Sequence, residues 1–128
     1  MNQEFAKEYF EEFLEKPGII NVDAEDVTFI LGKEEAMERF YGFGVAEREK
    51  GLEQAVKRAM KDLRKSLSEK PDGVLMTIYG DATLTNVNEM ATYVADELCG
   101  ETTNMLFGYV NGEPEEPLEV LLVASKRK

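Results

Sequence analysis

The stretch PGIINVDAED, residues 17–26, divides the chain between an acidic amphipathic segment and the longer remainder. Pro17 and Gly18 predict the end of a helix, because proline clashes with a preceding helical turn and glycine tolerates positive φ. The next two residues, Ile19 and Ile20, are expected to enter a core. The polar spacing N-x-D-x-x-D follows the apolar step at residues 21–26, so the stretch combines a turn, a core anchor and an acidic cluster.

The spacing of the acids alone allows two structural interpretations. An aspartate before an apolar-periodic run is typical of a helix N-cap, and Val27, Ile30 and Leu31 supply the i, i+3, i+4 spacing of a short helix. The rival interpretation places Val27, Phe29 and Leu31 on one face of a strand. Capping signatures are common, so spacing by itself favours a structural role for these acids over a chemical one.

The remainder of the chain alternates between helical and strand-like patterns. Apolar residues recur with a period near 3.6 in some segments, and continuous apolar runs or aromatic and glycine residues mark others as strands. We predict helices over residues 2–15, 48–67 and 87–98, and strands over residues 35–46, 74–79, 105–110 and 118–124. Thr85 or Asn86 is the expected cap of the last helix. The aromatic stripe of the first helix predicts that it packs back on the sheet.

Composition excludes several classes of function. The chain has 128 residues with 15 basic and 26 acidic side chains, a net charge of −11, which argues against nonspecific nucleic-acid binding. It has one cysteine, no histidine and no apolar run long enough to span a membrane. We therefore expect a single cytoplasmic domain without a membrane span, a metal or a cofactor, in which Cys99 serves packing.

The stretch at residues 17–26 resembles the synergy loop of FtsZ, the tubulin-like cell-division GTPase, which reads proline-glycine, two aliphatics and N-x-D-x-x-D. In that family the loop enters the nucleotide site of the next subunit, where its aspartates position the water that attacks the γ-phosphate. The resemblance implies that Asp23 and Asp26 are catalytic in trans, and that Pro17, Gly18 and Asn21 belong to the binding loop. It continues in order through residues 42–46, 73–80, 104–108 and 118–125.

The resemblance covers only the second half of the family fold. FtsZ proteins cradle phosphates with a glycine-rich loop in their first half, and no such motif occurs in these 128 residues. The implied organisation is one domain, residues 1–128, with a linking helix at 1–16, a synergy-like loop at 17–26 and an FtsZ C-terminal-like domain at 27–128. The chain is accordingly not expected to be a GTPase on its own. It is either a natural stand-alone protein or a domain excised from a longer one.

We expect an α+β fold with a mixed four-stranded sheet, two helices on one face and the N-terminal helix on the other, similar to the chorismate-mutase-like second domain of FtsZ and tubulin. The implied function is regulatory: the loop is presented to the GTP site of an FtsZ-like or tubulin-like partner, or to another copy. The alternative is an oligomeric small-molecule-binding or metabolic module. Its candidate pocket residues are Arg39, Arg48, Tyr79 and Asp81, although no spacing singles them out.

Overall fold

Four strands form one mixed sheet in the computed structural model, which describes residues 2–128. They are β1 (Met37–Ala46), β2 (Gly73–Gly80), β3 (Asn104–Asn111) and β4 (Leu118–Arg127). Their spatial order is β1-β4-β2-β3, in which β4 pairs antiparallel with β1 and β2, and β3 runs parallel to β2. The apolar runs of β2 and β4 hence lie in the centre and are covered on both faces, as predicted.

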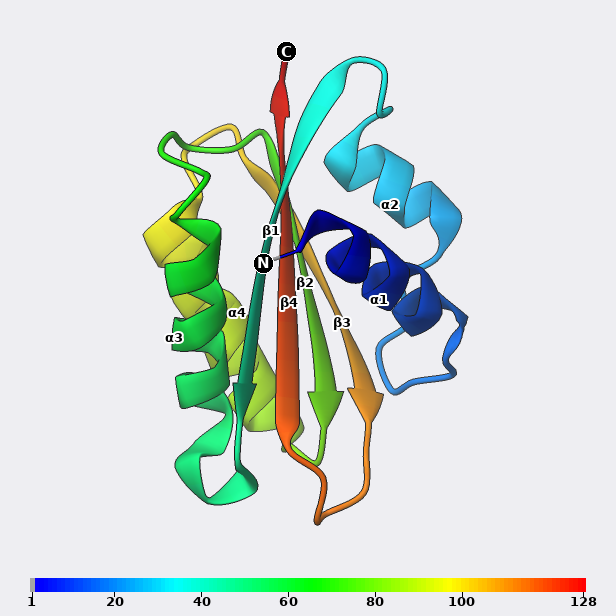
Figure 1. Ribbon diagram of the computed structural model, residues 1–128, viewed down its shortest axis with the longest axis vertical. Helices are drawn as coiled ribbons and strands as arrows, with labels where there is room; N and C mark the ends of the chain where they lie inside the picture. Colours follow the sequence, from blue (N-terminus) through cyan, green and yellow to red (C-terminus); the bar gives the residue numbers. More distant parts are fainter. Residues whose placement is uncertain (1) are drawn as a thin grey trace.

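The helices divide between the two faces of this sheet (Figure 1). They are α1 (Gln3–Glu15), α2 (Ala24–Leu31), α3 (Gly51–Leu63) and α4 (Leu84–Leu98), with one 3₁₀ turn, η1 (Arg48–Lys50), before α3. The long helices α3 and α4 pack on one face, whereas α1 and the short α2 pack on the other (Figure 1). The predicted α+β arrangement, with two helices on one face and the N-terminal helix opposite, is confirmed.

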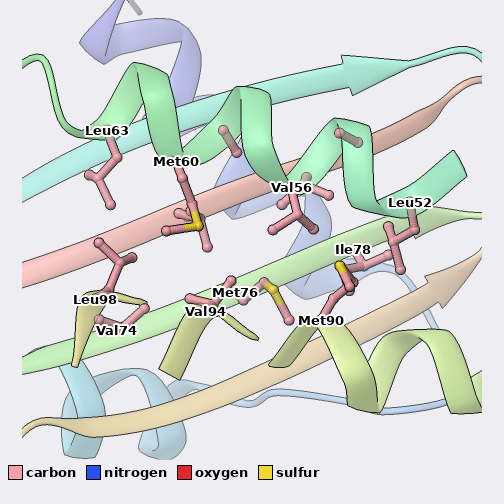
Figure 2. Packing of buried hydrophobic residues seen from close by; sticks show 14 of the residues in the cluster. Leu52, Val56, Met60, Leu63, Val74, Met76, Ile78, Met90, Val94 and Leu98 are labelled. Atoms are coloured by element: carbon pink, nitrogen blue, oxygen red, sulfur yellow. The ribbon is translucent and has the colours of Figure 1, made fainter. Parts of the chain in front are cut away.

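The face beneath α3 and α4 holds the larger core. Figure 2 shows Val56, Met60 and Leu63 of α3 reaching toward the sheet beside apolar side chains of β2 and α4. Two glycines of β1 permit this packing: a Cβ on Gly42 would lie 2.3 Å from the Ala59 carbonyl oxygen, and one on Gly44 would lie 2.2 Å from that of Ala55. These glycines serve close helix–sheet contact rather than ligand binding.

The opposite face has a second, smaller core. Phe10 and Ala6 of α1 and Ile30 of α2 cover Leu75, Leu121 and Val123 of the two central strands, and all six are buried. The aromatic stripe of α1 is not buried throughout, because Phe5 is 48% exposed at its start. Its ring lies edge-on to Phe43 with centroids 5.6 Å apart, so it packs against the rim of the sheet.

The structure corrects three predicted boundaries. The helix expected over residues 48–67 covers only Gly51–Leu63. Gly51 adopts φ 83° and separates η1 from α3, and residues 64–66 form a turn after the helix. The cap of α4 is Thr83, whose hydroxyl accepts a hydrogen bond from the Asn86 amide at 3.1 Å, rather than Thr85 or Asn86. The last strand extends to Arg127, since its end pairs with the beginning of β1.

The first helix begins where the sequence indicates. The side chain of Asn2 caps α1 by accepting hydrogen bonds from the amides of Glu4 and Phe5 at 2.9 and 3.2 Å. Met1, the first residue of the predicted 1–16 segment, lies outside the described residues. Within residues 2–128, no helix is long and apolar enough to cross a membrane.

Candidate functional site

The loop between α1 and α2 lies along β3, an edge strand of the sheet. The amides of Ile19 and Ile20 donate to the Tyr109 carbonyl oxygen at 3.0 and 3.1 Å, and the Tyr109 amide donates back to the Ile20 carbonyl at 2.9 Å. An unpaired edge strand is a template for association with other chains. The loop covers part of this edge, and the pairing fixes its position on the domain.

Tyr109 is itself held by the end of β2 and the turn after it. Its side chain is fully buried, and its hydroxyl oxygen accepts from the Ala82 amide at 2.9 Å while lying 2.7 Å from the Ala82 carbonyl oxygen. A buried tyrosine whose hydroxyl is satisfied in this way is fixed in place. The loop is thus anchored to a rigid part of the fold. Sequence reasoning missed Tyr109, since nothing local marks it as the loop's partner.

Gly18 is required for close approach and not for a special backbone angle. Its φ is not positive, so the left-handed conformation expected of this glycine is wrong. A Cβ at Gly18 would lie 2.6 Å from the Tyr109 carbonyl oxygen, closer than real Cβ atoms come. Asn21 fixes the same turn, because its side chain accepts from the Gly18 amide at 2.9 Å and donates to the Gly18 carbonyl at 3.1 Å. Pro17 precedes this turn and is exposed.

The two aspartates form a reciprocal capping box at the start of α2. Oδ1 of Asp23 accepts from the Asp26 amide at 2.9 Å, and Oδ2 of Asp26 accepts from the Asp23 amide at 3.1 Å. The helical interpretation of residues 27–31 is therefore right, and the rival strand is wrong. Asp23 is exposed and Asp26 half-buried. The second oxygen of each carboxylate has no partner within residues 2–128, so each retains an acceptor.

Large apolar side chains are exposed on either side of these acids in the sequence. Ile19 is 53% exposed, which contradicts its expected burial, whereas Ile20 is half-buried against the core. Phe29 of α2 is 76% exposed and lies three residues after Asp26, so both are on the same side of the helix. Exposed apolar groups beside polar ones mark a surface that can contact another protein. Phe29 was considered only as a strand residue, so this signal was missed.

A cation and an acid hold the other end of the loop. Lys16, which ends α1, places Nζ 4.5 Å from the centre of the Tyr79 ring. The Tyr79 hydroxyl donates to the Glu116 carboxylate at 3.2 Å, and partial desolvation together with that carboxylate raises the pKa of Tyr79. These contacts tie the loop to the connection between β3 and β4.

The residues considered for a small-molecule pocket do not converge. Arg48 pairs with Asp81 at 2.9 Å, while Arg39 lies near the opposite end of β1 beside Glu34. Cys99 is half-buried, and desolvation raises the pKa of its thiol against the opposing charge of Lys70, in keeping with packing. Within residues 2–128, no three His, Cys, Asp or Glu side chains are grouped to hold a metal.

Comparison with known proteins supplies the context of this loop. No family model matches the chain, and no curated protein matches it. Among solved structures, an empty FtsZ dimer from M. jannaschii is similar with a TM-score of 0.72 and 27% identity. A mutant of M. jannaschii FtsZ gives 0.74 and 22%, and CetZ from Methanosaeta thermophila gives 0.70 and 14%.

The similarity extends over almost the whole chain. The three matches cover 94%, 99% and 97% of it, but only 35%, 42% and 36% of the proteins to which it is similar. The chain thus spans well under half the length of those relatives. Its order of helices and strands and its mixed sheet are those of their second domain. The chain has the fold of the C-terminal domain of FtsZ and its tubulin-like relatives.

Proposed function

We propose that this domain presents residues 17–26 to the nucleotide-bearing face of an FtsZ-like GTPase subunit. Asp23 and Asp26 then act in trans on the water that attacks the γ-phosphate, orienting it electrostatically as water-positioning residues do in other NTPases. The segment at residues 1–16 corresponds in this proposal to the helix that links the two halves of the family fold. The observation that carries the proposal is a pair of aspartates, each with one carboxylate oxygen outside the capping box, on a loop that is fixed to the sheet edge.

Two features of the surface support docking at this place. The loop is held by Tyr109 and by the Asn21–Gly18 hydrogen bonds, so little conformational entropy would be lost when a partner binds. Ile19 and Phe29 offer apolar area beside the acids. The 128 residues contain no glycine-rich phosphate loop, so the nucleotide in this mechanism is held by the partner.

Such a domain affects a filament in one of two measurable ways. Added as these 128 residues, which contain no phosphate-binding loop, it caps the filament end or stimulates hydrolysis without extending the polymer. FtsZ from M. jannaschii is a suitable partner because its structure is similar to this chain. Phosphate release and sedimentable polymer should be followed together while the domain is added to that FtsZ and GTP. A fall in polymer mass or a rise in phosphate released per polymer is expected.

Isosteric variants separate the charges from the fold. Asp23→Asn and Asp26→Asn keep a side-chain oxygen for the capping box, since asparagine is also a good N-cap. The double variant should still bind but lose at least about tenfold of any stimulation. Glu101→Gln, at an exposed site after α4, is the matched control and should behave as the unmodified domain. Unchanged hydrolysis and polymer mass at saturating binding would contradict the proposal.

A further inference from the structure

A cleft of about 450 Å³ lies between the first turns of α1 and the start of β1, on the same face as α2. The loop of residues 17–26 follows the opposite end of α1, a helix of 13 residues that is about 20 Å long. The cleft is therefore separate from the loop, and a ligand bound in it would be independent of the function proposed for the loop. Its volume falls within the range of small-molecule sites.

One residue that lines the cleft is Arg39, whose hydrogen-bond donors are not all paired within the fold. The Arg39 side chain is only 15% exposed, and its buried Nε has no hydrogen-bond partner within residues 2–128. One guanidinium nitrogen, Nη1, lies 3.4 Å from Oε1 of Glu34, whose side chain is 59% exposed. That contact is long and solvated, and it leaves most of the five N–H donors of Arg39 without an acceptor in the fold.

The buried Nε–H of Arg39 is a donor without an acceptor within residues 2–128. Buried polar groups are nearly always paired, and an unpaired charged donor is costly because it has lost its hydration. The planar fork of arginine matches the two oxygens of a carboxylate or phosphate. The cleft gives such a group access to Arg39 from the solvent side, and Glu34 is the competitor that it must displace.

The rest of the lining sets the shape of the ligand. Lys7 and Lys128 add two cations, and Glu4 and Glu38 add two carboxylates besides Glu34, so three positive and three negative side chains line the cleft. The six charges sum to zero, so the lining offers no excess positive charge for a polyanion. Met37 and Tyr41 contribute an apolar wall to the same cleft, and Tyr41 is buried against the sheet.

We propose that this cleft binds a small amphipathic molecule with one anionic head, a carboxylate or a phosphate monoester, and an apolar body. The head pairs with Arg39 in place of Glu34, with Lys7 and Lys128 at the rim, and the body lies against Met37 and Tyr41. This binding site is new relative to the loop and uses none of its residues.

Titration followed by NMR tests the proposal directly. Phenyl phosphate and phenylacetate carry the two candidate heads on one aromatic body, and 2-phenylethanol carries the body without charge. Either anion should cause saturable shifts of the Arg39 Nε–Hε signal and of the Tyr41 amide at millimolar concentrations. The neutral alcohol should not shift the Arg39 signal, and the tighter of the two anions identifies the head. The absence of saturable shifts with both anions would overturn the proposal.

Variants with opposite expected signs sharpen the test. Glu34→Gln removes the competing carboxylate and should tighten binding by about threefold or more, whereas Arg39→Gln should weaken it at least about tenfold. Arg48→Gln, which breaks an ion pair elsewhere, is the matched control and should change nothing. Because Glu34 is exposed, Glu34→Gln folds even if Arg39→Gln does not. Affinity that is unchanged or weakened in Glu34→Gln would overturn the proposal, as would shifts that survive Arg39→Gln in the folded protein.

Discussion

The face of the sheet under α3 and α4 is sealed by buried apolar side chains, whereas the face under α1 and α2 leaves reactive and apolar groups open. On the first face, the buried cluster from Leu52 to Ala124 contains only apolar side chains and Tyr109. On the second, Phe5 and Phe29 are exposed, and the half-buried Arg39 has a buried Nε without a hydrogen-bond partner within residues 2–128. Both candidate sites belong to the second face, so one face supplies stability and the other remains available for binding.

The largest expected contrast comes from removing one large side chain from each face. Leu63→Ala leaves a cavity in the sealed core and should lower the free energy of unfolding by about 2–5 kcal/mol. Phe29→Ala, at a site 76% exposed, should change it by less than about 0.5 kcal/mol. Urea unfolding of both variants measures the difference. Equal losses would show that the Phe29 side chain is buried in solution and that the faces do not differ in this way.

Matched glycine substitutions test how firmly each face holds its helix. Gly44→Ala forces a Cβ against the Ala55 carbonyl in the middle of α3 and should cost about 1–3 kcal/mol of global stability. Gly73→Ala forces one against the Ile30 carbonyl at 1.8 Å, a backbone contact that a displacement of the 8-residue helix α2 would relieve. The loss of amide protection should therefore be concentrated in α2. Amide hydrogen exchange distinguishes them, and global loss of protection in Gly73→Ala would contradict the difference.

The cap of α2 should give a smaller effect. Asp23→Ala removes the acceptor for the Asp26 amide and should destabilise the protein by about 1 kcal/mol, whereas Asp23→Asn should be within a few tenths. Exchange of the α2 amides and urea unfolding both report it. If Asp23→Asn destabilised as much as Asp23→Ala, the charge and not the hydrogen bond would be what stabilises the helix start.

Alkaline pH should give the smallest contrast, at the rim of the open face. Burial, and then the Glu119 carboxylate, which accepts a hydrogen bond from the Tyr9 hydroxyl at 2.8 Å, raise the pKa of Tyr9 above its usual value of 10.0. The unfolded chain therefore loses this proton first, so stability is complete below about pH 10 and falls as pH rises further. Tyr9→Phe should flatten that fall in urea unfolding at several pH values. An identical alkaline slope in Tyr9→Phe would contradict the assignment.

Sequence patterns predicted most of the fold because buried apolar residues recur at regular spacings along the helices and form continuous runs in the central strands. The period near 3.6 of α3 and α4 and the continuous apolar runs of β2 and β4 each reflect one element facing one core. Boundaries differ from the prediction where one residue decides them: the positive φ of Gly51 separates η1 from α3 within one continuous helical pattern. The aspartates of the loop were likewise predicted as a cap, because capping is a local interaction.

The two sites could be predicted only in part. The residues of the acidic loop were named from their resemblance to the FtsZ synergy loop, yet the loop's anchor, Tyr109, lies about 90 positions away on another strand. Arg39 was one of several arginines without distinction in the sequence. Arg39 differs from the other arginines because its side chain is only 15% exposed and lines the cleft. The cleft forms only when α1 and the C-terminal end of the chain lie beside β1.

The sequence by itself determined which segments are helices and strands, which strands are central, and that an asparagine and two aspartates come after a proline–glycine turn. Only the tertiary structure decided that Gly18 must lack a side chain to approach Tyr109, and that Arg39 is enclosed without enough acceptors. The physical reason is the distance along the chain over which each kind of interaction acts. Periodicity and capping arise between residues a few positions apart, whereas close approach and desolvation arise between segments that meet only when the sheet has formed.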